Sequence, residues 1–302
     1  MIRFDSFQRL IVRYSANYML QLYFHLSKNK LEYRLNSSNE NLSNGIIISL
    51  TSFSARIHRA WLAIETLLRQ TKKPDGIILW LSSEQFPDLS HLPTSLLAMR
   101  DRGLRIELRD GDLRSHKKFY YVKKEYPDAT IVLADDDILY PETMLEELCA
   151  ASVLYPGKVV GRFTKRMEWS PARDLLPYAS WKTVNDGRVG TDYFFGSGGG
   201  TLIPPAAVHL DVLNKEAFLK CCPFSDDIWL NAMCRLVSQE MVSISRPFTL
   251  LPIINRDSTA LTNINNGQRR NDEQLAVVRE YCRDVYEIDP FESIEFIPVT
   301  FD

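Results

Sequence analysis

The sequence predicts an α/β fold in which helices flank a mostly parallel sheet. Three observations lead to this prediction. Short apolar runs alternate with amphipathic stretches, each gap between runs can hold one crossover helix, and polar turns follow the runs. With 302 residues and 45% hydrophobic content, the chain can bury one large core or two closely packed halves.

The chain is predicted to begin with an amphipathic helix and a linker, residues 1–43. Apolar side chains recur at helical spacing within residues 8–26, and basic residues outnumber acidic ones there. This helix can pack on the body of the protein, which its wide apolar face favours, or lie on an anionic membrane surface. Polar residues 36–44 follow as the linker.

Four strands with intervening helices are predicted next. The strands cover residues 46–50, 76–81, 104–108 and 130–134, and the helices cover residues 55–70, 94–102 and 115–126. The first helix ends before Lys72-Lys73-Pro74, a pattern typical of a helix end. Ligands of parallel sheets bind at the carboxyl ends of the strands, so the turns after these strands form the candidate site.

The second half of the chain has shorter predicted elements. Strands are expected at residues 159–163, 178–184 and 193–196, and helices from Pro141 and at residues 206–219 and 226–237. An Asn-rich stretch at residues 263–268 and a polar stretch at residues 271–274 follow.

The most informative motif is a run of three aspartates, Asp135, Asp136 and Asp137, at the end of the apolar residues 129–134. Adjacent carboxylates repel one another, and such hard oxygen ligands suit Mg²⁺ or Mn²⁺, which also carries nucleotide phosphates. A solvated loop with one aspartate capping the next helix is the alternative, and it explains one aspartate of the three. The motif therefore predicts a metal–nucleotide site.

Three other segments provide candidate residues. Glycines at residues 196–200 allow close approach to a ligand, or simply a tight turn, and the segment is neither a P-loop nor a dinucleotide fingerprint. Asp226 and Asp227 begin a predicted helix, where one can act as a cap and the other as a general base. The basic run from His116 to Lys118 stands at the start of its predicted helix, where positive charge is unfavourable because of the helix dipole. An anionic ligand would offset this repulsion; the alternative is that the basic residues form a solvated face.

Composition argues against several classes of protein. The net charge of −2 gives no support for nucleic-acid binding. Five scattered cysteines, without a CxxC pair, indicate reduced thiols and neither a disulfide framework nor a zinc site. No run approaches the ~20 apolar residues of a spanning helix, and no signal-peptide pattern is found. The expected location is the cytoplasm, with peripheral contact to the inner membrane surface through residues 8–26 as the further option.

The order of these motifs resembles that of the GT-A glycosyltransferases, in particular the family 2-like bacterial enzymes. The resemblance covers residues 44–240 and rests on the strand ending in Ser-Leu-Thr-Ser-Phe, the Asp triplet, the Gly-rich segment and the Asp-Asp pair. It implies a GT-A domain at residues 44–250, with a nucleotide-binding half up to residue 140 and an acceptor half from residue 141. Residues 251–302 would be a C-terminal extension that can close as a lid.

The resemblance also implies the chemistry of the site. The donor would be a nucleotide-diphosphate sugar, the cofactor Mn²⁺ or Mg²⁺, and the acceptor a carbohydrate or lipid-linked glycan in polysaccharide or glycoconjugate synthesis. The implied residues are Thr51, Phe53, Lys117, Asp135, Asp136, Gly198, Gly199 and Gly200 for the donor, Asp135 and Asp137 for the metal, and Asp227 as the general base of an inverting transfer.

The chain departs from the family pattern at two points. Many relatives carry an acidic residue directly after the second strand, whereas the nearest one here is Glu84. Some add a late histidine to the metal, but the last histidine here, His209, lies on a predicted helix. If the transfer retained configuration, Asp227 would orient the acceptor instead of acting as the base.

Two rival classes of function remain. A strand ending in Asp-x-Asp also begins the haloacid dehalogenase-type phosphohydrolases, but there it is usually the first strand, and Thr or Val stands where this chain has Leu139. The other rival is a non-catalytic GT-A-like module that binds sugar nucleotide or carbohydrate. Intact Asp137 and Asp227 argue against that module.

Overall fold

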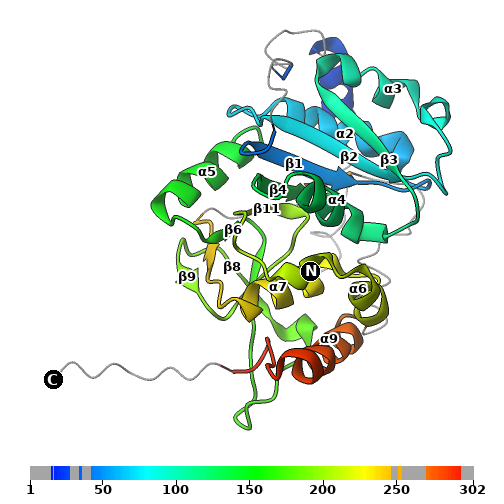
Figure 1. Cartoon of the computed structure of the whole chain (residues 1–302). Coiled ribbons are helices and arrows are strands. Elements are labelled where there is room, and N and C mark those ends of the chain that lie inside the picture. Colours follow the sequence, from blue (N-terminus) through cyan, green and yellow to red (C-terminus); the bar gives the residue numbers. More distant parts are fainter. Residues whose placement is uncertain are drawn as a thin grey trace, which may run out of the picture.

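The chain folds around an eight-stranded sheet with the strand order β3-β2-β1-β4-β11-β6-β12-β9 (Figure 1). This computed structural model describes residues 15, 17–27, 34, 35, 42–245, 251–253 and 270–293. The strands of this sheet are β1 (Ile46–Thr51), β2 (Gly76–Ser82), β3 (Leu104–Arg109), β4 (Thr130–Ala134), β6 (Val159–Gly161), β9 (Val189–Gly190), β11 (Gly199–Ile203) and β12 (Met241–Ser243).

The first four strands are parallel and are linked by helices. β1 pairs in parallel with both β2 and β4, and β2 pairs in parallel with β3. The links contain α2 (Ile57–Leu68), α3 (Thr94–Leu97) and α4 (Lys117–Glu125). The predicted α/β fold, a Rossmann-like and mostly parallel sheet with flanking helices, is confirmed. Because parallel strands end at the same edge, the turns after β1 and β4 lie next to each other.

One antiparallel strand brings the second half of the chain to this edge. β11 lies between β4 and β6 and pairs Gly199 with Ala134, so the Gly-rich segment lies beside the Asp triplet. Two small sheets complete the strands. They are β10 (Tyr193–Phe195) with β7 (Thr164–Arg166) and β8 (Lys182–Val184), and β13 (Leu251–Pro252) with β5 (Ile138–Leu139).

Among the described residues that follow β5, the α-helices are α5 (Met144–Leu154), α6 (Lys215–Cys221), α7 (Asp226–Leu236) and α9 (Arg270–Tyr286). Three predicted elements are wrong in part. The predicted helix at residues 206–219 is a 3₁₀ turn followed by α6, because the Asn214 side chain accepts a hydrogen bond from Ala217 N–H and begins a new helix. The predicted helix at residues 94–102 is α3 plus a 3₁₀ turn. The predicted strand at residues 178–184 begins with a 3₁₀ turn.

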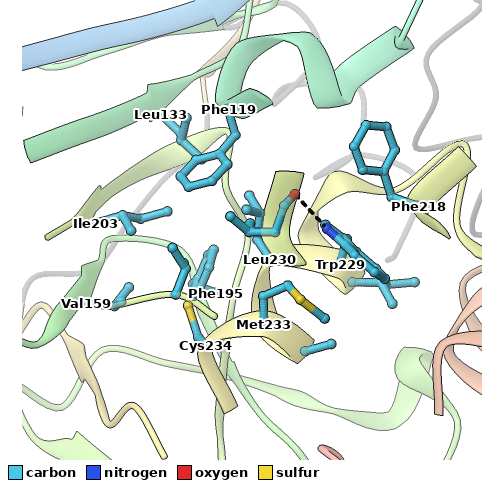
Figure 2. Close-up of a cluster of buried hydrophobic side chains, with 14 of the residues drawn as sticks. Phe119, Leu133, Val159, Phe195, Ile203, Phe218, Trp229, Leu230, Met233 and Cys234 are labelled. Atoms are coloured by element: carbon cyan, nitrogen blue, oxygen red, sulfur yellow. Dashed lines mark hydrogen bonds between the residues drawn. The ribbon is translucent and has the colours of Figure 1, made fainter. Parts of the chain in front are cut away.

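Hydrophobic cores on both faces of the sheet hold these helices. Residues of α4, α6 and α7 pack on one face, and residues of α2, α3 and α5 pack on the other. Figure 2 shows the first core, where Trp229 of α7 lies beside Phe218 of α6, with the ring centres 6.2 Å apart. Trp229 also donates a hydrogen bond to Val212 O at 3.0 Å. Each such side chain contributes about 1.5–3 kcal/mol on burial, so the N-terminus of α7 is firmly placed.

Helix α9 shares the core that holds α7. Its residues Leu275, Val278 and Cys282 belong to the same buried cluster as Trp229. The described part of the C-terminal extension is therefore integral to the fold. The lid predicted at Asn271 and Asp272 stays a prediction, and the structure places both residues in the first turn of α9. Residues 254–269, including the Asn-rich stretch, lie outside the described residues.

The N-terminal segment packs on the body of the protein through one face. Residues 17–27 are helical, and Phe24 lies in a cluster with Leu62 and Ala63 of α2. Asn17 Nδ2 donates a hydrogen bond to Pro252 O at 3.2 Å. The predicted packing is thus confirmed for these residues, while residues 8–14 and 16 and linker residues 36–41 lie outside the description. Within the described ranges, no helix has the length and apolar character needed to cross a membrane.

Candidate active site

A cavity of about 810 Å³ opens at the carboxyl ends of β1 and β4. It brings together segments that are far apart in the sequence. Of the site residues predicted above, those that line it are Thr51, Phe53, Lys117, Asp135, Asp136, Asp137, Gly198, Gly199 and Asp227. Gly200 is not among the described lining residues; its φ of 92° favours glycine, and an added Cβ would lie 2.8 Å from Met144 Sδ.

The three aspartates differ in their surroundings. The side chains of Asp135 and Asp137 are 37% and 26% exposed, whereas that of Asp136 is 5% exposed. Asp136 accepts a hydrogen bond from Ser52 Oγ at 2.5 Å and another from Arg56 Nη1 at 3.1 Å. Asp135 and Asp137 are therefore the carboxylates available to a ligand in the cavity, and Asp136 anchors the turn.

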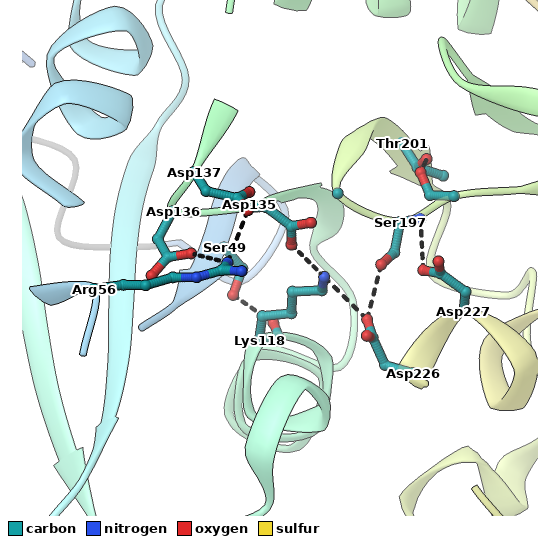
Figure 3. A network of polar contacts seen from close by, with 12 residues as sticks. Ser49, Arg56, Lys118, Asp135, Asp136, Asp137, Ser197, Thr201, Asp226 and Asp227 are labelled. Atoms are coloured by element: carbon teal, nitrogen blue, oxygen red, sulfur yellow. Dashed lines mark hydrogen bonds and ion pairs between the residues drawn. The ribbon is translucent and has the colours of Figure 1, made fainter. Parts of the chain in front are cut away.

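Lys118 connects the two acidic motifs, as Figure 3 shows. Its Nζ lies 2.6 Å from Asp135 Oδ1 and 3.1 Å from Asp226 Oδ2, and its side chain is buried. Burial acts to lower the pKa of Lys118, but Asp135 and Asp226 outweigh it and raise the pKa above the usual value. The lysine thus stays charged and joins the end of β4 to the start of α7.

The Gly-rich segment is held against the Asp triplet. Asp135 N–H donates to Tyr140 Oη at 2.6 Å, and Tyr140 O–H donates to Gly198 O at 2.5 Å. A Cβ added at Gly198 would lie 1.7 Å from Asp135 Oδ2, so a larger residue does not fit without displacing that carboxylate. Of the two interpretations of this segment, close approach is the one that applies at Gly198.

Asp226 and Asp227 have opposite electrostatic environments. Ser197 N–H donates to Asp227 Oδ1 at 2.7 Å, and Ser197 Oγ donates to Asp226 Oδ2 at 2.8 Å. Burial acts to raise the pKa of Asp226, but the charge of Lys118, helped by the hydrogen bond from Ser197, outweighs it, so this pKa is lowered. Burial, followed by repulsion from Asp226, raises the pKa of Asp227 to about 7. A carboxylate with such a pKa is suited to accept a proton near neutral pH.

The structure corrects two interpretations of helix starts. Ser225 is the N-cap residue of α7 and makes no side-chain cap bond, so Asp226 is not a cap but the partner of Lys118. His116 is buried and its Nε2 lies 2.9 Å from Cys222 O. Burial lowers the pKa of His116 to about 4, so the histidine adds no charge to an anion site. Of the basic run, only Lys117 and Lys118 line the cavity, and Lys117 is paired with Asp112.

The acidic residues of the cavity fit a divalent cation shared with a substrate. Burial, and then repulsion from Asp135, raises the pKa of Asp137 to about 7, so a cation at this carboxylate would favour its charged form. Among the described residues, no group of three or more His, Cys, Asp and Glu side chains is arranged to hold a metal ion. Mg²⁺ commonly uses one or two carboxylates and completes its shell with phosphates and water. Asp135 and Asp137 meet that lesser requirement.

The part of the cavity wall formed by Tyr178 and Phe224 was not predicted from the sequence. Tyr178 and Phe224 both line the cavity, and each is tied to the C-terminal helix. Tyr178 N–H donates to Asp272 Oδ1 at 2.7 Å, and Phe224 N–H donates to Gln274 Oε1 at 2.9 Å. The only signal in the sequence was the polar stretch at residues 271–274, whose Asn271 lines the cavity as well.

Asp112, in the turn after β3, also lines the cavity and was not predicted. It accepts a hydrogen bond from Gln85 Nε2 at 2.6 Å. Glu84, the residue considered from the sequence, is not among the described lining residues. The polar turn at residues 110–112 was the available signal.

Comparisons with known proteins add little beyond the architecture. No protein-family profile and no curated protein matches the chain. Solved structures that it resembles include the mannosyltransferase PcManGT from Pyrobaculum calidifontis with GDP-Man and Mn²⁺ (12% identity, 93% of this chain, 77% of that chain, TM-score 0.48). Another is a TarS fragment from S. aureus with UDP (10% identity, 80% of this chain, 72% of that chain, TM-score 0.43). A third is 4-diphosphocytidyl-2C-methyl-D-erythritol synthase from Anaerococcus prevotii (12% identity, 59% of this chain, 78% of that chain, TM-score 0.36).

Proposed function

We propose that this protein is a metal-dependent glycosyltransferase of the family 2-like GT-A type. It moves a sugar from a nucleotide-diphosphate sugar to an acceptor hydroxyl in polysaccharide or glycoconjugate synthesis. One observation carries the proposal. A single cavity is lined by Asp135 and Asp137, whose carboxylates are partly exposed, and by Asp227, whose pKa of about 7 suits a base. Lys118 ties the two ends of this site together, because it pairs with Asp135 and with Asp226, the neighbour of Asp227.

The donor binds at the carboxyl ends of the first strands. Thr51 and Phe53 line the nucleotide pocket, and Lys117 lies toward the phosphates. Asp135 and Asp137 hold Mn²⁺ or Mg²⁺, which offsets the negative charge that grows on the departing diphosphate. Gly198 lets the backbone lie directly against Asp135, and the glycine segment borders the donor sugar.

Asp227 acts on the acceptor. Ser197 N–H fixes Oδ1 of Asp227 at 2.7 Å, which leaves Oδ2 to take the proton of the acceptor hydroxyl. The hydroxyl then attacks the anomeric carbon from the face opposite the leaving diphosphate, which inverts the configuration. The fixed orientation and the raised pKa of Asp227 both favour this proton transfer.

Donor hydrolysis tests the proposal without knowledge of the acceptor. Purified protein is incubated with a panel of sugar nucleotides and Mn²⁺, and the release of nucleoside diphosphate is measured. The proposal predicts release that needs Mn²⁺ and is lost in Asp137→Asn. Binding of sugar nucleotide by the wild type without release, even with simple glycosides added as acceptors, would favour the non-catalytic module.

The exposed face of the N-terminal helix supports a peripheral membrane contact. We infer that this contact places the cytoplasmic enzyme near a lipid-linked acceptor. The apolar side chains on the face that points away from the body are Tyr18, Met19, Leu22, Tyr23 and Leu26, which are 46–80% exposed. A helix bound to a protein normally presents polar residues to water, and apolar residues with Tyr suit the headgroup region of a bilayer.

A further inference from the structure

Arg56 forms ion pairs with two residues of the Asp triplet, Asp136 and Asp137 (Figure 3). Its Nη1 is 2.8 Å from Asp137 Oδ2 and 3.1 Å from Asp136 Oδ1. The guanidinium carbon lies 5.3 Å from the centre of the Phe53 ring, and the side chain is 11% exposed. Arg56 is the N-cap residue of α2, so this charge comes from a fixed point directly after the turn that follows β1.

The guanidinium and a divalent ion need the same carboxylate. Asp137 is one of the two proposed metal ligands, and its Oδ2 already accepts an ion pair from Arg56. Asp136 is a poor second ligand for the ion, because its side chain is 5% exposed and its oxygens already accept hydrogen bonds from Ser52 and Arg56. A cation that reaches Asp137 therefore meets a positive charge within a few ångströms, and like charges at that distance repel strongly in a partly buried site.

We propose that Arg56 keeps divalent cations off Asp137 until a nucleoside diphosphate arrives, so that metal and diphosphate bind as a unit. The proposal rests on the proposed function. A diphosphate brings enough negative charge to offset both the ion and the guanidinium. Arg56 is then a positioning residue that sets the order of binding. Coupling of this kind is reciprocal, so the metal raises the affinity for the diphosphate by the factor by which the diphosphate raises the affinity for the metal.

Binding of Mn²⁺ tests this order directly, without any turnover. Free Mn²⁺ is titrated by electron paramagnetic resonance against the wild type, alone and with UDP or GDP present. The wild type should bind Mn²⁺ at least about tenfold more tightly with the diphosphate that fits. In Arg56→Gln, binding of Mn²⁺ alone should tighten by at least about tenfold, and the coupling to the diphosphate should shrink.

Two further variants control for charge and for folding. Arg59→Gln removes the same charge from the first turn of α2, and Arg59 is not among the described residues that line the cavity. It should behave as the wild type does. Arg56→Lys keeps the positive charge and should still exclude Mn²⁺, and thermal unfolding of each variant checks that it is folded.

The outcomes separate this inference from the proposed function. If the wild type binds Mn²⁺ as tightly alone as with diphosphate, or if Arg56→Gln binds Mn²⁺ alone no more tightly than the wild type does, the role of Arg56 is refuted while metal-dependent donor binding stands. The role of Arg56 is also refuted if Arg56→Lys binds Mn²⁺ alone as tightly as Arg56→Gln does. If no nucleoside diphosphate binds to any variant with Mn²⁺, the proposed function itself fails.

Discussion

Replacing Asp227 by asparagine should stabilise the protein while removing its base. Burial and the neighbouring Asp226 raise the pKa of Asp227 from 3.8 to about 7 in the folded state. Ionisation of Asp227 therefore costs stability, and this cost grows as pH rises from the unfolded value through about 7. Each pKa unit corresponds to about 1.4 kcal/mol, so Asp227→Asn should add about 2 to 4 kcal/mol to the free energy of unfolding at pH 8, allowing for solvent screening.

The pH dependence separates this electrostatic effect from a change in packing. At pH 5 the folded protein holds the proton on Asp227, and the gain should fall to about 1 kcal/mol. Asparagine keeps the oxygen that accepts from Ser197 N–H, so that contact is not lost. The assay is urea denaturation of wild type and Asp227→Asn at both pH values, with donor hydrolysis measured in parallel.

Asp226→Asn provides the matched opposite case. The pKa of Asp226 is lowered, and its ion pair with Lys118 is lost in the variant, so the protein should be destabilised at pH 8. Equal changes in the free energy of unfolding for Asp227→Asn at pH 5 and pH 8, or destabilisation at pH 8, would refute the assignment of the two carboxylates.

Three more predictions concern the rate, the core of the site and the membrane. With saturating Mn²⁺, donor hydrolysis should fall about tenfold per pH unit below pH 7 as Asp227 gains its proton, and a rate that rises toward acid pH contradicts its role as base. Lys118→Met should lower the free energy of unfolding by about 3–5 kcal/mol in urea, because the buried Asp226 and the partly exposed Asp135 lose their cation, whereas the exposed Lys124→Met should change little. Leu22→Glu combined with Leu26→Glu should abolish co-sedimentation with anionic lipid vesicles and leave the Tm unchanged, and undiminished co-sedimentation would rule out this helix as the contact.

The sequence predicted the parts of the site that depend on local patterns. Apolar runs bounded by turns marked the four parallel strands, and the end of the fourth strand placed the Asp triplet at the ligand edge of the sheet. The order of motifs then predicted that Gly198 and Asp227 would share a cavity with it, and they do.

Residues whose role depends on helix register were missed. The predicted helix at residues 115–126 begins at Lys117 in the structure, and Lys117 and Lys118 point in directions about 100° apart around its axis. Only the three-dimensional packing decides that Lys118 is the one that reaches Asp135. Arg56 belongs to the same class, since its pairing with Asp137 depends on how the turn after β1 enters α2.

The part of the cavity wall formed by Tyr178 and Phe224 could not be predicted, because it is assembled from distant segments. Tyr178 and Phe224 are separated by the Gly-rich segment and are held by the start of α9. Neither contact follows from a periodic pattern, and a strand was expected where the 3₁₀ turn at Tyr178 begins.

Ligand-induced thermal stabilisation shows directly whether the Asp triplet binds a metal ion together with a nucleoside diphosphate. Wild type and Asp137→Ala are melted with a panel of nucleoside diphosphates and sugar nucleotides, with and without Mn²⁺. A ligand at 100 times its Kd adds about 2.7 kcal/mol to stability, which is a measurable rise in Tm. We expect one type of nucleotide to stabilise the wild type only when Mn²⁺ is present, and we expect Asp137→Ala to lose this stabilisation. No shift with any nucleotide, or the same shift in Asp137→Ala, would contradict a metal–diphosphate site at the Asp triplet.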